Sequence, residues 1–373
     1  MKDKPQISPS QLTWLTVASM VSLGIFTFPR EVAEASGDGA VLSFAVALGV
    51  ALVGATLLTR LAEMFPASTG SSYAQRILGR PLGLVFGLVV ALFYTAFVAL
   101  ITRNTSDLLK TTLYEATPVE VLMIVFLLTT AYAAQKGIVG VSRVVGLALP
   151  VVYFALLVLY LLALTRGRLI FLIPHWPGSA ALFQGVFRTM YVFLGFPVLL
   201  MVLPFLEKPR TATSRVKIGV FLNALLLVEI LVAAFAVFGP SGVRGILYPS
   251  VQVLTQTQIH GWLIERLGLF VAIGWAVIDF CGVAVFLWAI STSTAQLLGL
   301  KPEKFWYVMA VLIPLVIILA KLPANVEQVA VLLPIFSAFG LAVAVVLPIF
   351  LWAVARVRGF EGRSEHGGRP DES

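Results

Sequence analysis

Long apolar stretches alternate with short polar connections along the whole chain. A helix needs about 20 mostly apolar residues to cross the hydrocarbon core of a bilayer. By this measure the sequence predicts an all-α membrane protein with ten spans, at roughly 10–36, 39–60, 81–105, 118–135, 141–165, 180–206, 212–238, 265–298, 305–320 and 328–355. One transmembrane domain would cover 10–357, between a cytoplasmic segment 1–9 and a polar tail 358–373 that we expect to be disordered.

Two of these spans carry an interruption in their apolar pattern. The first runs Val17-Ala-Ser-Met-Val-Ser-Leu-Gly-Ile-Phe-Thr-Phe-Pro29, and roughly 170 residues later comes Tyr191-Val-Phe-Leu-Gly-Phe-Pro197. Gly leaves the backbone uncovered and Pro removes a donor, so a helix breaks readily at such places. Unpaired backbone groups at membrane depth are tolerated only around a cavity or ligand, and paired interruptions typify transporter binding sites. The alternative is that Gly and Pro are simply common in membrane helices.

The paired interruptions suit a small zwitterion. Free amides at Leu23, Gly24 and Ile25 would head a half-helix and bind a carboxylate without a basic side chain. Carbonyls of the first half-helix and around the second interruption would face an ammonium group. An amino acid fits this arrangement, and so does a small carboxylate paired with a cation. The predicted ligand-binding residues are Ser22, Leu23, Gly24, Ile25, Tyr94, Tyr191, Phe193, Leu194 and Gly195.

Ionisable groups well inside a predicted span are costly and are candidates for function, and three such residues are Asp279, Glu229 and Arg188. Asp279 is the most central, and it would carry a proton, bind a cation or make a structural hydrogen bond. For Arg188 and Glu229 we favour structural roles. They would pair with each other, or the long side chain of Arg188 would extend its charged end to the outer membrane interface.

Composition agrees with a membrane protein, because 59% of the residues are hydrophobic, 12% are charged and the mean hydropathy is +0.98. The net charge of +8 does not indicate nucleic acid, since the basic residues lie in short loops. Roughly twice as many Lys and Arg residues fall on one side of the predicted topology as on the other. That bias favours both termini in the cytoplasm. Ten spans then divide into two inverted five-span repeats, about 10–165 and 180–355, with broken first and sixth helices.

The sequence offers little for an enzyme. Its three histidines are scattered with no metal-ligand spacing, the single Cys281 is predicted at membrane depth, and no phosphate-binding Gly-rich loop with Lys is present. We therefore expect no catalytic residues, no metal and no cofactor. The outer stretch 239–262 is too polar to span, and it would serve as a lid over an outer cavity or as a passive loop.

Two motif regions carry a family resemblance. The segments Ile7-Ser-Pro-Ser-Gln11, Ser19-Met-Val-Ser-Leu-Gly-Ile-Phe-Thr-Phe-Pro-Arg30 and Ala35-Ser-Gly-Asp-Gly39 resemble the start of spore germination permeases. Tyr248-Pro-Ser250 followed by Ile264-Glu-Arg-Leu267 and Trp275 is similar to that family's outer loop and eighth helix. These permeases are the B subunits of Ger-type germinant receptors and belong to the amino acid–polyamine–organocation superfamily.

The resemblance implies a five-plus-five inverted repeat and a protein that senses a germinant, typically a small amino acid, at the two interruptions. It implies the spore inner membrane and assembly with A-type and C-type receptor subunits. A proton- or sodium-coupled amino acid transporter, with Asp279 as the coupling group, is the alternative. Relatives carry a lysine shortly after the tryptophan of the eighth helix, where this chain has Asp279, Cys281 and Gly282. The ligand and any coupled ion are therefore open.

Overall fold

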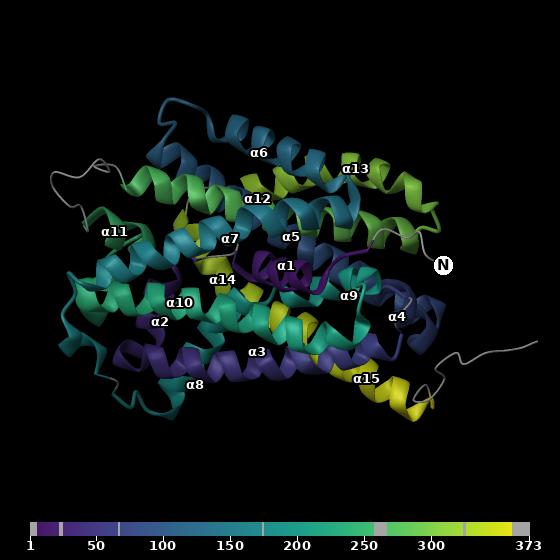
Figure 1. Ribbon diagram of the computed structural model, residues 1–373, viewed down its shortest axis with the longest axis horizontal. Coiled ribbons are helices and arrows are strands. Elements are labelled where there is room, and N and C mark those ends of the chain that lie inside the picture. The colour runs from purple at the N-terminus through teal and green to yellow at the C-terminus, as the bar shows by residue number, and fades with distance from the viewer. Residues whose placement is uncertain are drawn as a thin grey trace, which may run out of the picture.

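The computed structural model describes residues 6–21, 25–65, 68–173, 175–256, 267–323 and 326–359, and these are almost entirely helical. The longer helices are α1 (Pro9–Val21), α2 (Phe28–Ser36), α3 (Ala40–Glu63), α4 (Gly70–Leu78), α5 (Arg80–Thr112), α6 (Val119–Ala134), α7 (Gly137–Leu164), α8 (Ser179–Thr189), α10 (Ala212–Val243), α11 (Pro249–Gln256), α12 (Leu267–Leu297), α13 (Phe305–Lys321), α14 (Val326–Leu341) and α15 (Leu347–Val357). Figure 1 shows them as a bundle in which most helices run along the long axis.

Within the described residues, seven helical segments are long and apolar enough to cross a membrane, namely Phe28–Glu63, Arg80–Thr112, Gly137–Leu164, Ser179–Phe205, Pro209–Val243, Phe270–Leu297 and Val331–Val357. Two shorter apolar helices, α6 and α13, accompany them. The all-helical membrane class is thereby confirmed. The count of ten spans, the inverted repeat and the domain limits stay predictions.

The surface of α7 shows why the chain requires a lipid environment. One face buries Leu149, Tyr153 and Tyr160 against the bundle. The opposite face exposes large apolar side chains one helical turn apart, among them Leu147 at 76% and Val151 at 69%. Soluble monomers rarely expose contiguous apolar surface of this extent, so this face suits contact with hydrocarbon.

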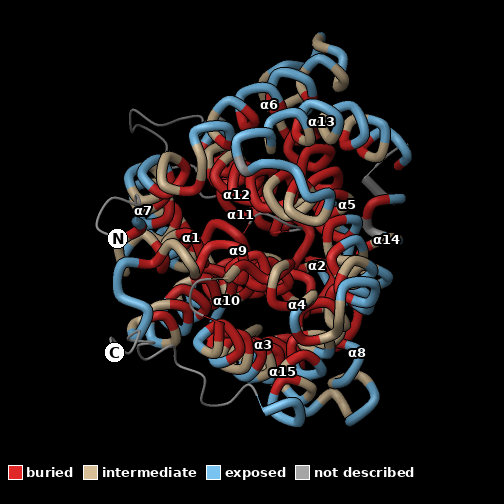
Figure 2. Tube along the Cα trace, turned by 90° about the vertical axis from the view of Figure 1, so that its right-hand side faces the viewer, coloured by how far each residue is buried: buried red, intermediate tan, exposed pale blue. Residues whose placement is uncertain are grey.

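The centre of the bundle is well packed, as the buried positions gathered there in Figure 2 show. The first helix, α1, contacts α7, α10 and α12. The residues just before α1 are held by a β-bridge between Ile7 and Leu206, the residue that follows the segment Ser179–Phe205. The two interrupted segments therefore lie side by side.

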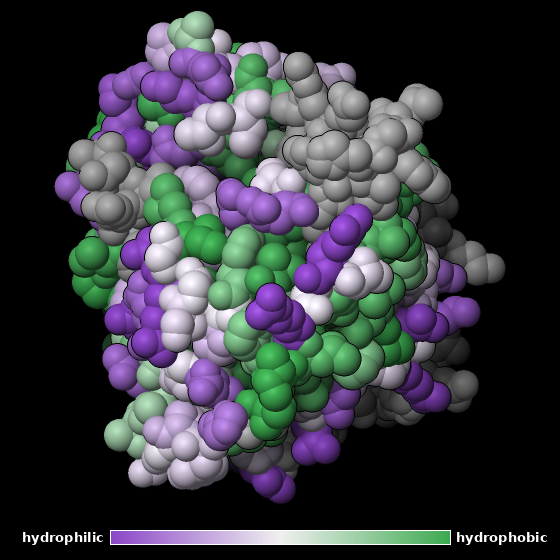
Figure 3. Space-filling model, turned by 90° about the vertical axis from the view of Figure 1, so that its left-hand side faces the viewer, coloured by the Kyte–Doolittle hydropathy of each residue, from purple (hydrophilic) through white to green (hydrophobic). Residues whose placement is uncertain are grey.

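The two ends of the bundle differ. α11 and α2 lie at one end, and α4 and α15 at the other (Figure 1). The end with α11 presents hydrophilic side chains interspersed with apolar ones (Figure 3). Most of the predicted cytoplasmic segment and disordered tail, residues 1–5 and 360–373, lies outside the described residues. Arg358, at the start of the predicted tail, donates to the carbonyl of Ile77 in α4 at 2.5 Å.

Candidate ligand site at two helix interruptions

The first interruption separates α1 from α2. α1 ends at Val21, residues 25–27 form a turn, and α2 begins at Phe28 with Pro29 in its first turn, where a missing N–H costs no helical bond. Ile25 is completely buried. The predicted site residues Ser22, Leu23 and Gly24 lie outside the described residues, so their part of the site stays a prediction.

The second interruption replaces α-helix with 3-10 turns. α8 passes into η3 (Met190–Phe193) and η4 (Phe196–Val198), and α-geometry returns only in α9 (Leu199–Val202). Pro197 stands at the start of η4, where it cannot donate a backbone hydrogen bond. The predicted residues Tyr191, Phe193 and Leu194 are all buried, at 1% exposure or less.

The two interruptions touch through Gly195. A Cβ atom built on Gly195 would lie 1.6 Å from the carbonyl oxygen of Ser19 in α1. No side chain fits there, so the bare backbone of the second interruption lies directly against the last turn of α1. Gly195 is thus a predicted site residue of the second interruption that contacts α1 directly.

Aromatic and aliphatic side chains pack behind this contact. The Phe193 ring lies 5.7 Å from that of Phe44 in α3, and Leu194 fills the space at Gly340 in α14. A polar partner that the sequence analysis did not assign is Asn223 of α10. Its Nδ2 donates to the carbonyl of Val192 at 3.4 Å, and its Oδ1 has no hydrogen-bond partner among the described residues.

The first interruption is tied to the predicted loop 239–262 by α11. Ser250 Oγ donates to the carbonyl of Ile25 at 2.7 Å, with the carbonyl of Phe26 at 3.3 Å. The Ser250 carbonyl in turn accepts from the Tyr160 hydroxyl of α7 at 3.0 Å. The described part of the loop 239–262 therefore bonds to the interruption. Its motif Tyr248-Pro-Ser250 stood out in the sequence, but nothing local marked Ser250 as a partner of Ile25.

Tyr94 lies on the α4 side of the second interruption. Its ring stacks on Phe286 of α12 with a centroid distance of 5.1 Å, and it lines a cavity of about 50 Å³ together with Pro197 and Val198. Its hydroxyl is buried and has no hydrogen-bond partner among the described residues.

Asp279 lies away from the two interruptions, but it is connected to the first one. It is fully buried in α12, and its Oδ2 lies 2.5 Å from Oγ1 of Thr105 in α5. One helical turn earlier, the ring of Trp275 lies 5.7 Å from that of Phe26. Asp279 is thus one turn from a residue that touches the first interruption.

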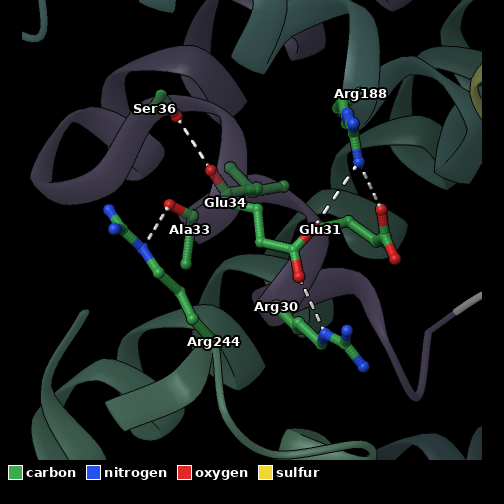
Figure 4. A network of polar contacts seen from close by, with 8 residues as sticks. Arg30, Glu31, Ala33, Glu34, Ser36, Arg188 and Arg244 are labelled. Carbon is green, nitrogen blue, oxygen red and sulfur yellow. Dashed lines mark hydrogen bonds and ion pairs between the residues drawn. The ribbon is translucent and has the colours of Figure 1, made fainter. Parts of the chain in front are cut away.

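The prediction that Arg188 and Glu229 pair with each other is wrong. Arg188 in α8 bonds Glu31 of α2 at 3.0 Å and lies 3.7 Å from Glu34, as Figure 4 shows. Glu34 also accepts from Arg30, at 2.9 Å. The carboxylates were missed because they belong to α2, whose contact with α8 depends on tertiary packing. Glu229 is 9% exposed, and its Oε2 has no hydrogen-bond partner within the part of the chain described.

The site holds hydrogen-bonding groups and apolar surface rather than a metal-binding set. Among the described residues, no three His, Cys, Asp or Glu side chains are grouped closely enough to hold a metal ion. The arrangement suits binding of a small molecule by backbone and hydroxyl groups.

Known proteins resemble this chain over almost its full length. It is 25% identical to spore germination protein YndE of Bacillus subtilis (strain 168) over 361 residues, which cover 95% of this chain and 97% of YndE. It is 17% identical to spore germination protein B2 of the same organism over 365 residues, covering 98% and 99%. Spore germination protein GerLB of Bacillus cereus is 22% identical over 366 residues, covering 96% and 97%. The family model described as spore germination protein matches residues 6–329, and the chain therefore belongs to the spore germination permease family.

Proposed function

We propose that this chain is the germinant-sensing membrane subunit of a spore germination receptor and binds a small amino acid at the two helix interruptions. The observation that carries the proposal is the contact of Gly195 with the Ser19 carbonyl. It brings the 3-10 segment of the second interruption against the last turn of α1, next to the first interruption, inside a membrane-spanning bundle. Such backbone is tolerated at membrane depth where it is buried in protein or lines a cavity.

The proposed binding chemistry uses opposite ends of half-helices. Amides of residues 22–25 would bind the ligand carboxylate at the positive end of the second half-helix. Carbonyls at the end of α1 and around Phe193 and Leu194 would bind the ammonium group. Tyr191 and Tyr94 would complete the site with hydroxyl groups. Because the described walls are buried and mostly apolar, this geometry suits a small ligand.

The proposed signal is a population shift between an open and a closed state. α11 would act as the closing element, because Ser250 bonds the carbonyls of Ile25 and Phe26 at the edge of the site. A ligand shifts this equilibrium only by its difference in affinity for the two states. The contacts that the ligand gains when α11 closes must therefore supply the signal.

The remaining architecture follows the same proposal. The interrupted segments would be equivalent helices of two inverted repeats, about 10–165 and 180–355, with both termini in the cytoplasm. The protein would lie in the spore inner membrane and pass its change of state to A-type and C-type subunits. One relative is named spore germination protein A2, and 62% of this chain aligns with it.

A coupled amino acid transporter has weaker support. The relatives are named for germination, and none of the contacts at the two interruptions requires transport. We assign the protein no enzymatic activity.

The test is binding of a panel of radiolabelled amino acids to the purified protein, followed by uptake into proteoliposomes. We expect saturable binding of at least one small amino acid without concentrative uptake. Uptake driven by a proton or sodium gradient would replace the sensor with the transporter. Saturable binding that survives unchanged in a Gly195→Val variant would show that the ligand binds elsewhere.

A further inference from the structure

The carboxyl group of Asp279 shares one hydroxyl group with a backbone carbonyl. Thr105 Oγ1 lies 2.5 Å from Asp279 Oδ2 and 2.9 Å from the carbonyl oxygen of Ile101. Both of these distances are hydrogen-bond distances. A threonine hydroxyl has a single proton to donate, but it can accept through its lone pairs. If Asp279 were ionised, one proton would have to serve two acceptors.

Neighbouring threonines of α5 indicate where the Thr105 proton goes. Thr95 donates to the carbonyl of Ala91 at 2.7 Å, and Thr112 donates to the carbonyl of Leu108 at 2.6 Å. Both are bonds to the residue four positions earlier, as is the bond from Thr105 to Ile101. With its proton committed to Ile101, Thr105 can only accept from Asp279. The proton between the two side chains then belongs to the carboxyl group.

Burial leads to the same conclusion. Asp279 and Thr105 are both 0% exposed, and a lone carboxylate at this depth is costly unless it is neutralised. The ion pairs on three elements packed against α12, namely α5, α6 and α13, use other carboxylates, because Arg103 bonds Asp107 at 2.7 Å and Lys321 bonds Glu120 at 3.4 Å. Within the described residues, no ion pair involves Asp279.

The elements that contact α12 carry other titratable groups. They are Arg80, Tyr94, Arg103, Asp107 and Lys110 of α5, Glu120 and Tyr132 of α6, Arg143, Tyr153 and Tyr160 of α7, Tyr73 and Arg76 of α4, Glu303 and Lys304 of η7 (Pro302–Lys304), and Tyr307 and Lys321 of α13, with Cys281 on α12 itself.

Unpartnered hydroxyl groups mark the same face of α5. Thr102 and Ser106 lie three residues before and one residue after Thr105, which places all three within one side of the helix. Oγ1 of Thr102, Oγ of Ser106 and Oδ1 of Asp279 are buried without a hydrogen-bond partner among the described residues. Polar groups of this kind are expected where a small polar species is bound.

We propose that Asp279 is a proton-binding site, in which a neutral carboxylic acid donates to Thr105 and Thr105 donates to the Ile101 carbonyl. This assigns a proton, rather than a sodium ion, to the buried carboxyl group. This assignment does not depend on whether the protein binds an amino acid. It requires only deprotonation and reprotonation of one carboxyl oxygen.

Infrared difference spectroscopy of the purified full-length protein in lipid tests this assignment. A protonated carboxylic acid has a C=O stretching band that is distinct from carboxylate bands and shifts in D₂O. At neutral pH we expect such a band in the native protein and its loss in Asp279→Asn. The band should persist in Asp107→Asn, which removes an ion-paired carboxylate, and in Glu229→Gln, which removes another buried carboxyl group.

Infrared spectra of Thr105 variants supply a second test, which does not depend on the Asp279→Asn variant folding. Thr105→Val removes the acceptor, so the carboxylic acid band should shift to higher wavenumber, whereas Thr105→Ser should leave it in place. A neutral-pH spectrum without a band that depends on Asp279 or Thr105 would overturn the proposal. So would a carboxylate band of Asp279 that responds to sodium ions.

Discussion

The sharpest test of the proposed ligand site is the smallest change at the contact between the two interruptions. In Gly195→Ala the new Cβ would lie 1.6 Å from the Ser19 carbonyl oxygen, whereas real Cβ contacts are essentially never under 3.0 Å. The two backbone segments must therefore move apart by roughly 1.4 Å, and neither is a flexible side-chain end. Overpacking of this kind typically costs about 1–3 kcal/mol.

If the ligand binds where these segments meet, the cost falls on the bound state. A penalty of about 2 kcal/mol corresponds to roughly 30-fold weaker binding. We would measure amino acid affinity and thermal unfolding of the purified variant, with Gly49→Ala as the matched control. A Cβ on Gly49 meets nothing within 4 Å, so that variant should match the native protein. Native affinity and native stability in Gly195→Ala would refute the apposition of the interruptions.

Three further changes test separate parts of the structure. Ser250→Ala removes the donor to the Ile25 carbonyl, so it should speed ligand dissociation by roughly 10-fold, which corresponds to about 1.4 kcal/mol. The control is Thr255→Ala, which removes an exposed hydrogen bond within the same helix and should leave the dissociation rate unchanged. Arg188→Gln leaves the Glu31 side chain, which is 3% exposed, without its ion-pair partner. Thermal unfolding should show a loss of stability of about 2 kcal/mol, and the double variant with Glu31→Gln should recover part of that loss. Tyr94→Phe removes a hydroxyl that has no described partner, so stability should stay within about 0.5 kcal/mol while amino acid affinity falls; equal affinity would exclude Tyr94 from the site.

The all-helical membrane class was predictable because apolar length and backbone preference are local properties of the chain. Hydrocarbon thickness sets the length of an apolar stretch, and Gly and Pro act on their own backbone. The second interruption was accordingly placed where Met190–Val198 leaves α-geometry. The first was placed between α1 and α2, although its central residues lie outside those described.

The contacts that give these elements their roles were not predictable, because they join residues far apart in the chain. Arg188 and Glu31 are 157 positions apart, and Ser250 and Ile25 are 225 apart. Thr105 and Asp279 are 174 apart. A sequence indicates that a buried charge needs a partner, but only packing decides which one. Pairing Arg188 with Glu229, both on neighbouring predicted spans, failed for this reason.

The proposed proton site and the proposed ligand site are linked through α12, and this link has a thermodynamic consequence. Trp275 touches Phe26 at the first interruption, and Asp279 follows one turn later on α12. If closing of the ligand site moves Trp275, the contact of Asp279 with Thr105 moves with it. Any coupling between the two sites must then be reciprocal. A proton that tightens amino acid binding tenfold must itself be bound tenfold more tightly in the presence of the amino acid, a coupling of about 1.4 kcal/mol. A sensor would show this coupling in its affinities alone, whereas a transporter would show it in flux as well. Affinities and flux measured across pH, with Asp279→Asn as the uncoupled form, therefore separate proton-tuned sensing from proton-driven transport.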